Sequence, residues 1–167
     1  VVVEQWAMGV SAAHQGFKLP LEIERFKIEI AEGARWMAVA SEQFDLILVD
    51  GFDADGKTGE LETLAFYQHC RERLTPGGLP VCNLLSRSPN FLQSCLVLDT
   101  VFKGHSRLLP QSPGGNVIAL AAVKQTAMLD SAALAARVSE LQARTGLDLE
   151  PLAVRLNSQE DGLPFGL

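Results

Sequence analysis

A near-continuous apolar run that ends in an acid, FDLILVD at residues 44–50, restricts the fold of this chain more than any other segment. The run is far shorter than the roughly 20 residues that a membrane-spanning helix needs. Apolar runs of this kind are typical of strands in a parallel sheet, because helices cover both faces of such a sheet. We therefore predict that residues 44–50 form a buried strand with helices as its neighbours.

Segments of strand type and helix type alternate along the whole sequence. Apolar or alternating runs predict strands over residues 1–3, 25–33, 44–50, 79–85, 105–110 and 116–123. Helical spacing of apolar residues predicts helices over residues 6–17, 33–41, 60–74, 88–104 and 130–146.

Turn and cap residues fit this alternation. TPGG at residues 75–78 ends one helix, Ser88 is the expected N-cap of the next, and QSPGG at residues 111–115 joins two strands. The pattern predicts a three-layer, Rossmann-like α/β fold with a mainly parallel sheet and an antiparallel hairpin at one edge. We assign residues 1–167 to a single domain, with residues 147–167 as its C-terminal tail.

Composition and charge argue against several classes of partner. The net charge is −6 and the basic residues are scattered, so the positive surface that binds nucleic acid is not expected. No apolar run is long enough to span a bilayer, so no membrane partner is expected either. The chain begins VVVEQW, without Met or a signal-type segment, and we expect that its true start lies elsewhere.

The three cysteines lack C-x-x-C spacing, which argues against a zinc site and against a disulfide framework. Free cysteines favour a reducing compartment, and we expect a cytoplasmic protein. The spacing D-x-x-D-x-D-G at residues 50–56 does not match a calcium-binding loop. We therefore predict no metal site.

Acids follow three of the predicted strands. Glu4 closes the first strand, Glu32 follows the second, and Asp50 ends the third with Asp53 and Asp55 close behind. Ligands of open α/β sheets bind beyond the carboxyl ends of the strands, where an acid can accept hydrogen bonds from ribose hydroxyls. Acids at these positions also cap the helices that follow, and for each of them this alternative stays open.

The order of several segments resembles the polyamine aminopropyltransferases (spermidine synthases), which have the class I S-adenosylmethionine-dependent methyltransferase fold. The segments that carry the resemblance are VVVE, AEGARWM, FDLILVDGFD, LETLAFYQHCRERLTPGG, LPVCNLL and GNVIALAA. The resemblance extends from Val1 to about Val123 and implies that the first strand and an N-terminal β-region of the family precede Val1. That first strand lies in the middle of the sheet, so we expect either an N-terminally truncated sheet whose neighbouring strands have unpaired edges, or a rearranged sheet or a partner chain that fills the gap.

The resemblance implies a role for each residue that matches the family pattern. Glu4 would bind the ribose, and Glu32 with Gly33 would bind adenine where the family has Asp-Gly. Asp50 would act as general base and also contact the co-substrate. Asp53 would hold the amine, and Tyr67 falls at a family position for substrate binding, although packing is the first interpretation of Tyr67.

The family's chemistry implies transfer of an aminopropyl group from decarboxylated S-adenosylmethionine, or binding of S-adenosylmethionine itself, with a small-molecule amine as acceptor and a homo-oligomeric assembly. Phe52 replaces a small polar residue, no proline follows Asp53, and no Gly-rich loop precedes the first helix. These departures leave two alternatives: a methyltransferase that acts on another small molecule, and a non-catalytic interaction module of the same fold.

Overall fold

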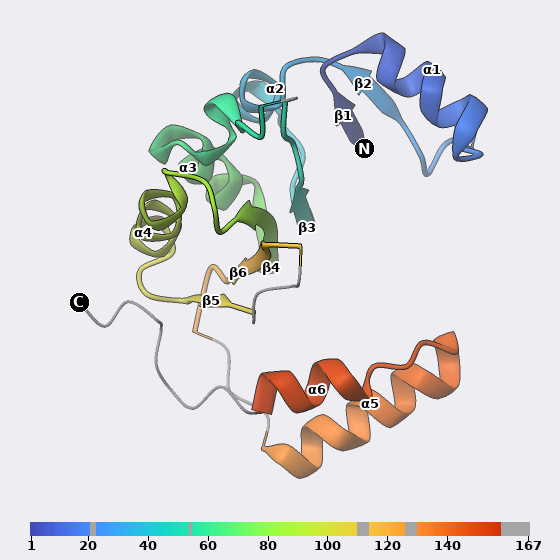
Figure 1. The fold of residues 1–167 in the computed structure, drawn as a ribbon, viewed down its shortest axis with the longest axis vertical. Coiled ribbons are helices and arrows are strands. Elements are labelled where there is room, and N and C mark those ends of the chain that lie inside the picture. The colour runs from blue at the N-terminus through green and yellow to red at the C-terminus, as the bar shows by residue number, and fades with distance from the viewer. Residues whose placement is uncertain (21–22, 54, 110–113, 126–129, 158–167) are drawn as a thin grey trace.

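The strands of this protein form two separate sheets in the computed structural model, which describes residues 1–20, 23–53, 55–109, 114–125 and 130–157 (Figure 1). The larger sheet has four strands in the order β3-β4-β6-β5, and the smaller is the pair β1-β2. The strands are β1 (Val2–Glu4), β2 (Ile28–Ile30), β3 (Phe44–Val49), β4 (Leu74–Leu85), β5 (Ser106–Leu108) and β6 (Asn116–Ala121). The helices are α1 (Ala7–Gly16), α2 (Gly33–Val39), the 3₁₀-helix η1 (Gly59–Glu62), α3 (Leu64–Arg73), α4 (Phe91–Val101), α5 (Ser131–Thr145) and α6 (Glu150–Asn157).

The larger sheet contains both parallel and antiparallel strand pairs. β3 pairs with β4 in parallel, whereas β4 with β6 and β6 with β5 are antiparallel. The predicted antiparallel hairpin at the edge is therefore confirmed, with β5 outermost.

The predicted turn at residues 75–78 is wrong, because these residues belong to the irregular start of β4, where the register with β3 shifts. Gly78 is needed there, since a Cβ at this position would lie 2.7 Å from the carbonyl oxygen of Phe44.

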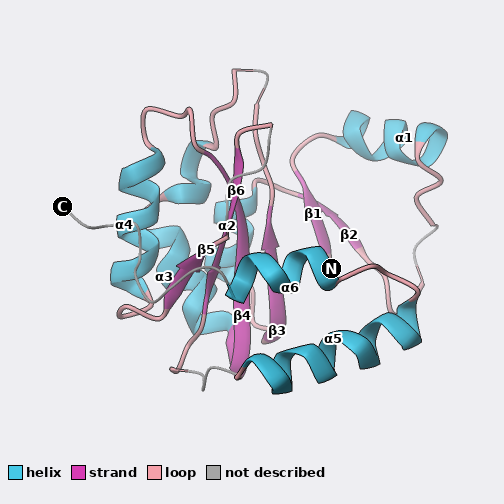
Figure 2. Cartoon of the chain, turned by 60° about the horizontal axis from the view of Figure 1, so that its bottom comes forward, coloured by secondary structure: helices cyan, strands magenta, loops and turns pink. Residues whose placement is uncertain are grey.

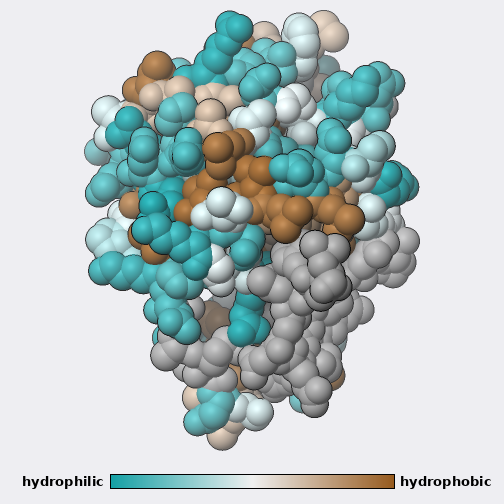
Figure 3. Space-filling model, turned by 90° about the vertical axis from the view of Figure 1, so that its left-hand side faces the viewer, coloured by the Kyte–Doolittle hydropathy of each residue, from teal (hydrophilic) through white to brown (hydrophobic). Residues whose placement is uncertain are grey.

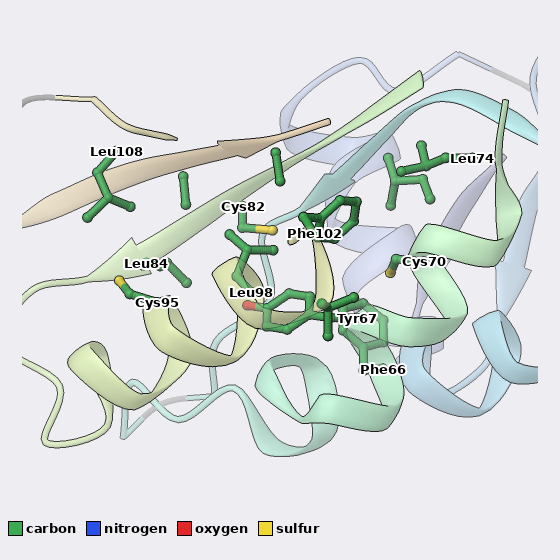
Figure 4. Packing of buried hydrophobic residues seen from close by; sticks show 14 of the residues in the cluster. Phe66, Tyr67, Cys70, Leu74, Cys82, Leu84, Cys95, Leu98, Phe102 and Leu108 are labelled. Carbon is green, nitrogen blue, oxygen red and sulfur yellow. The ribbon is translucent and has the colours of Figure 1, made fainter. Parts of the chain in front are cut away.

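Helices α2, α3 and α4 lie together on one side of the larger sheet (Figures 1 and 2). Between them and the sheet lies the hydrophobic core, to which α3, α4 and β4 contribute most of the largest buried side chains (Figure 4). These side chains are Tyr67, Cys70, Pro80, Cys82, Leu84, Cys95, Leu98 and Phe102. The outward side of α4 exposes Leu92 and Leu96, and Figure 3 shows apolar surface on this side of the molecule.

The other face of β3 is open in the described structure. Leu46 is 51% exposed and Leu48 is 70% exposed, whereas Ile47 between them is buried in the core. The prediction that helices cover both faces of this strand is therefore wrong for the residues described. The physical reason is that α2, α3 and α4 all pack on the face that carries Ile47, while α5 and α6 pack mainly on each other.

The pair β1-β2 is parallel and stands apart from the larger sheet. Val2 aligns with Ile28 and Glu4 with Ile30, and no pairing joins β1 to β3 within the described residues. β1 and β3 therefore each have one edge without a strand partner in the described structure. The unpaired edges that the sequence analysis expects are therefore present on β1 and β3 among the described residues.

Two helix starts differ from the sequence-based expectation. α4 begins at Phe91 with Asn90 as N-cap, because the Ser88 hydroxyl accepts a hydrogen bond from Asn90 N in the preceding turn instead of capping the helix. The segment predicted as one helix over residues 60–74 is divided into η1 and α3 at Thr63, whose hydroxyl accepts from Phe66 N at 3.3 Å. By contrast, α5 begins where the sequence predicts a helix, and of the two caps that the sequence allows, Asp130 and Ser131, the structure uses Asp130, whose Oδ1 lies 2.7 Å from Ala133 N.

In the described part of the chain, no helix combines the length and the apolar character that crossing a membrane requires.

Candidate functional site

The acids predicted at the strand ends lie where the sequence places them. Glu4 is the last residue of β1, Glu32 comes two residues after β2, and Asp50 directly follows β3. Because β1 and β2 are parallel and in register, Glu4 and the start of the β2–α2 turn lie side by side, and Ala31 N donates to Glu4 O at 3.0 Å. Glu4 and Glu32 therefore both lie at the carboxyl ends of the strands of the smaller sheet.

The Glu4 side chain turns toward the start of α1. Its Oε1 accepts a hydrogen bond from Trp6 N at 2.9 Å. It also lies against Gly9, where a Cβ would come within 3.2 Å of the carboxyl carbon. One carboxylate oxygen of Glu4 is thus already bound to the backbone N–H of Trp6, the N-cap residue of α1, although Glu4 is not itself the N-cap.

Glu32 is the N-cap of α2, and both of its carboxylate oxygens are engaged. Oε1 accepts from Ala34 N and Oε2 from Arg35 N, each at 2.9 Å. A carboxylate oxygen has more than one lone pair, so these bonds leave capacity for a further donor such as an amino group. The structure therefore shows a cap, and a ligand-binding role for Glu32 would be added to it.

The Leu61 side chain contacts both the turn after β2 and the end of β3. A Cβ on Gly33 would lie 3.0 Å from Leu61 Cδ2, and a Cβ on Gly51 would lie 2.6 Å from Leu61 Cδ1. Glycine at both positions allows this one leucine to fill the space between Glu32 and Asp50. The sequence-based interpretation missed Leu61, because nothing in the sequence indicates that η1 returns to this point.

Asp50 forms a side-chain hydrogen bond with Asn83, which sequence reasoning also missed. Val49 aligns with Cys82 in the parallel pair β3-β4, so the next residues along each strand, Asp50 and Asn83, lie side by side. Asn83 Nδ2 donates to Asp50 Oδ1 at 2.9 Å. The only signal in the sequence is the polar residue in LPVCNLL, whose partner depends on the strand register.

Asp53 organises the loop that follows Asp50. Its Oδ1 accepts from Asp55 N at 2.9 Å and from Lys57 N at 2.8 Å. Asp55 itself points to solvent, where its carboxylate lies 3.6 Å from Lys57 Nζ. Asp53 therefore fixes the loop shape, and among the three acids of this stretch Asp50 is the one placed at a strand end.

Tyr67 lies in the core and not on an accessible surface. Its side chain is 0% exposed and sits among Cys70, Cys82 and Cys95 (Figure 4). Burial is the main cause that raises the pKa of its hydroxyl far above the usual range. The structure therefore supports the packing interpretation of Tyr67, and contact with a substrate would require this side chain to leave the core.

The buried thiols are not placed for metal binding or nucleophilic chemistry. Burial raises the pKa of Cys82 to about 12 and that of Cys95 to about 11, so both remain protonated at neutral pH. Among the described residues, no three His, Cys, Asp or Glu side chains are grouped so that they could hold a metal ion.

Comparison with known proteins connects this geometry to one enzyme family. No family model matches the chain. The polyamine aminopropyltransferase of Chromobacterium violaceum is 33% identical over 147 residues, which are 88% of this chain and 56% of that protein. The chain is a partial homologue of the polyamine aminopropyltransferases. A polyamine aminopropyltransferase of Neisseria meningitidis serogroup A is 31% identical over 149 residues, and the chain spans about half the length of these curated relatives.

Solved structures agree at the level of the fold. A probable spermidine synthase from Corynebacterium glutamicum matches with a TM-score of 0.67 and 22% identity, over 98% of this chain and 64% of that chain. A spermidine synthase in complex with the transition state analogue AdoDATO matches with a TM-score of 0.64 and 24% identity, over 74% of this chain and 46% of that one. Human methyltransferase-like protein 13, in complex with SAH, matches with a TM-score of 0.66 and 20% identity, over 98% of this chain and 74% of that chain. These likenesses confirm the predicted class I methyltransferase type of fold.

Proposed function

We propose that this aminopropyltransferase homologue transfers an aminopropyl group from decarboxylated S-adenosylmethionine to a polyamine, and that Asp50 receives the attacking amine. The observation that carries the proposal is the position of Asp50 directly after β3, with its carboxylate hydrogen-bonded to Asn83 and exposed beside the Asp53 loop. An anionic group at this position attracts a polyamine, which is cationic at neutral pH.

The reaction needs little from the protein beyond placement of the two substrates. The amine nitrogen attacks the carbon next to the sulfonium, the new C–N bond forms, and the C–S bond breaks with its electron pair on sulfur. The leaving group is then a neutral thioether, so no acid has to protonate it. Asp50 contributes by orienting the amine and by accepting its proton, directly or through water.

The nucleoside would lie across the ends of β1 and β2. Glu4 would accept hydrogen bonds from the ribose hydroxyls, and Glu32 beside Gly33 would accept one from the adenine amino group in addition to its capping bonds. Asp53 would hold the far ammonium group of the polyamine through the carboxylate oxygen that the loop amides do not use. Support for these roles comes from the strand-end positions and from the homology.

Binding and transfer are tested on the natural protein that contains this sequence. Calorimetry with decarboxylated S-adenosylmethionine, S-adenosylmethionine and methylthioadenosine measures nucleoside binding, and mass spectrometry of a reaction with putrescine measures aminopropyl transfer. We expect the decarboxylated form to bind and to yield spermidine. Methyl transfer from S-adenosylmethionine without aminopropyl transfer would favour the methyltransferase alternative, and absence of nucleoside binding by the folded protein would favour the interaction module.

The role of Asp50 is tested with a matched pair of variants on the same strand. Asp50→Asn should lower transfer by about 100-fold or more, since general-base contributions are of this order, while methylthioadenosine affinity stays within about twofold. Asp45→Asn is the control, because Asp45 accepts a similar side-chain hydrogen bond, from Thr75 Oγ1 at 2.8 Å, at the other end of β3. A fully active Asp50→Asn variant would remove Asp50 from the mechanism.

A further inference from the structure

We infer that Asn83 is a positioning residue for Asp50: its side-chain amide fixes the orientation of the carboxylate at the end of β3. As a result, one defined oxygen of Asp50, Oδ2, is presented to the amine. This inference rests on the proposed function, since it assigns how the proposed amine-binding acid is held.

The strand register brings the two side chains together. β3 and β4 are parallel and aligned through Leu48 with Val81 and Val49 with Cys82. Side chains alternate between the faces of a sheet, so Asn83 lies on the face opposite the buried Cys82 and Leu84, the face on which Leu48 is also exposed. Asn83 therefore reaches Asp50 on the open face, at the strand end.

The chemistry of the pair leaves one arrangement for the amide. An ionised carboxylate only accepts hydrogen bonds, so Asn83 must turn its Nδ2 toward Asp50, as the 2.9 Å contact with Oδ1 shows. With the amide reversed, two acceptor oxygens would face each other and repel. Asp50 thus receives a neutral donor that adds no charge, and its negative charge remains available to attract an ammonium group.

The oxygen of the Asn83 amide adds no hydrogen bond to the fold among the described residues. Asn83 Oδ1 is buried and has no hydrogen-bond partner within the described residues. A buried acceptor without a partner destabilises a fold, and asparagine is also disfavoured in strands. A leucine of similar size would remove this unfavourable oxygen, so a purely structural account does not favour asparagine here.

Orientation matters because the amine nitrogen must meet both Asp50 and the electrophilic carbon. A carboxylate that rotates freely offers the amine several positions, whereas one with Oδ1 held by Asn83 offers Oδ2 in a defined plane. Losing such placement costs about 10- to 100-fold in rate, the range found for small misplacements of reacting groups.

The test compares Asn83→Leu with Thr75→Val in the natural protein that contains this sequence. Thr75→Val removes the equivalent hydrogen bond to Asp45 at the other end of β3 and serves as the matched control. For Asn83→Leu we expect kcat with putrescine to fall about 10- to 100-fold, with an unchanged KM for the nucleoside and an unchanged or higher melting temperature. Thr75→Val should keep the wild-type kcat. A kcat for Asn83→Leu within twofold of wild type, or an equal loss in Thr75→Val, would overturn the inference.

A second measurement decides the inference even where the proposed function fails. If the wild-type protein transfers no aminopropyl group, the proposed function is wrong, but the pairing of Asn83 with Asp50 is still visible by NMR. The two Nδ2 protons of Asn83 should give widely separated signals, and Asp50→Ala should bring them together. Signals that do not respond to Asp50→Ala would show that Asn83 does not hold Asp50.

Discussion

Leu61 and Gly51 lie in direct contact, so close that a Cβ on residue 51 would stand 2.6 Å from Leu61 Cδ1. Real Cβ atoms do not approach other carbons to this distance, so a side chain at residue 51 would push Leu61 away from the end of β3. Because Leu61 also contacts Gly33, the displacement would extend to the turn that carries Glu32.

Gly51→Ala is therefore expected to lower the free energy of unfolding by about 1 kcal/mol, the lower end of the usual cost of overpacking, because the atom that it meets is the end of the Leu61 side chain, which can shift. Gly16→Ala is the control, because no atom lies within 4 Å of a Cβ there and, since residue 16 belongs to helix α1, alanine is expected to raise the free energy of unfolding by up to about 1 kcal/mol and not to lower it. Urea denaturation measures both. Adding Leu61→Ala to Gly51→Ala should cost less than the sum of the single changes; simple additivity would show that the two residues do not share the space.

Glu32 allows capping and ligand binding to be measured separately. Glu32→Ala should lower the free energy of unfolding by about 1 kcal/mol, since α2 loses its N-cap. Glu32→Asn should retain most of that stability, because asparagine is also a good N-cap. If the carboxylate binds adenine, both variants should weaken methylthioadenosine binding in calorimetry. Normal affinity in Glu32→Asn would leave Glu32 as a cap alone.

Asp53 is expected to affect amine binding more than stability. Asp53→Asn keeps an oxygen that can accept from Asp55 N and Lys57 N, so the loop should retain its shape. The lost charge should raise the KM for the polyamine by about tenfold, equivalent to about 1.4 kcal/mol. Asp55→Asn is the control, since Asp55 pairs with Lys57 at the surface and should change the KM little. Equal effects of the two variants would indicate a general charge effect in place of a contact at Asp53.

The buried thiols predict a loss of stability at alkaline pH. Burial raises the pKa of Cys82 from 9.0 to about 12 and that of Cys95 from 9.0 to about 11, so the folded state holds these protons more tightly than the unfolded state. The contribution of these two protonated thiols to the free energy of unfolding is thus fully present below about pH 9. It decreases as the pH rises from there toward the folded pKa values, at no more than about 1.4 kcal/mol per pH unit for each thiol.

Urea titrations between pH 8 and pH 11 measure this slope. Cys82→Ala should make the slope shallower over this range, whatever its effect on stability at pH 8. An unchanged slope would show that Cys82 does not ionise on unfolding in this range.

Local sequence signals predicted most elements because each depends on neighbouring residues. Asp130 and Gly146 bound α5 through a side-chain cap and a left-handed turn; residue type limits the cap to Asp130 or Ser131 and places the helix end at Gly146. The sequence predicts a start of α4 two residues before the one observed, because Ser88 and Asn90 are both suitable caps and local sequence does not decide between them. The glycines at residues 77 and 78 indicated a turn, whereas Gly78 serves the close approach of Phe44 in a strand.

Periodicity and chain order are local properties, and they are enough to predict the order of strands and helices and the position of the acids Glu4, Glu32 and Asp50 at or just after strand ends. The tertiary fold brings Asn83 into a hydrogen bond with Asp50 and places Leu61 between Gly33 and Gly51, and neither contact is visible in the sequence. It also buries Tyr67 in the core, in agreement with the packing interpretation. The fold also leaves one face of β3 open, which the sequence does not predict, whereas the lack of pairing between β1 and β3 agrees with the expectation from the family resemblance. These relationships depend on strand register and on the face that each helix covers, which contacts between distant segments fix.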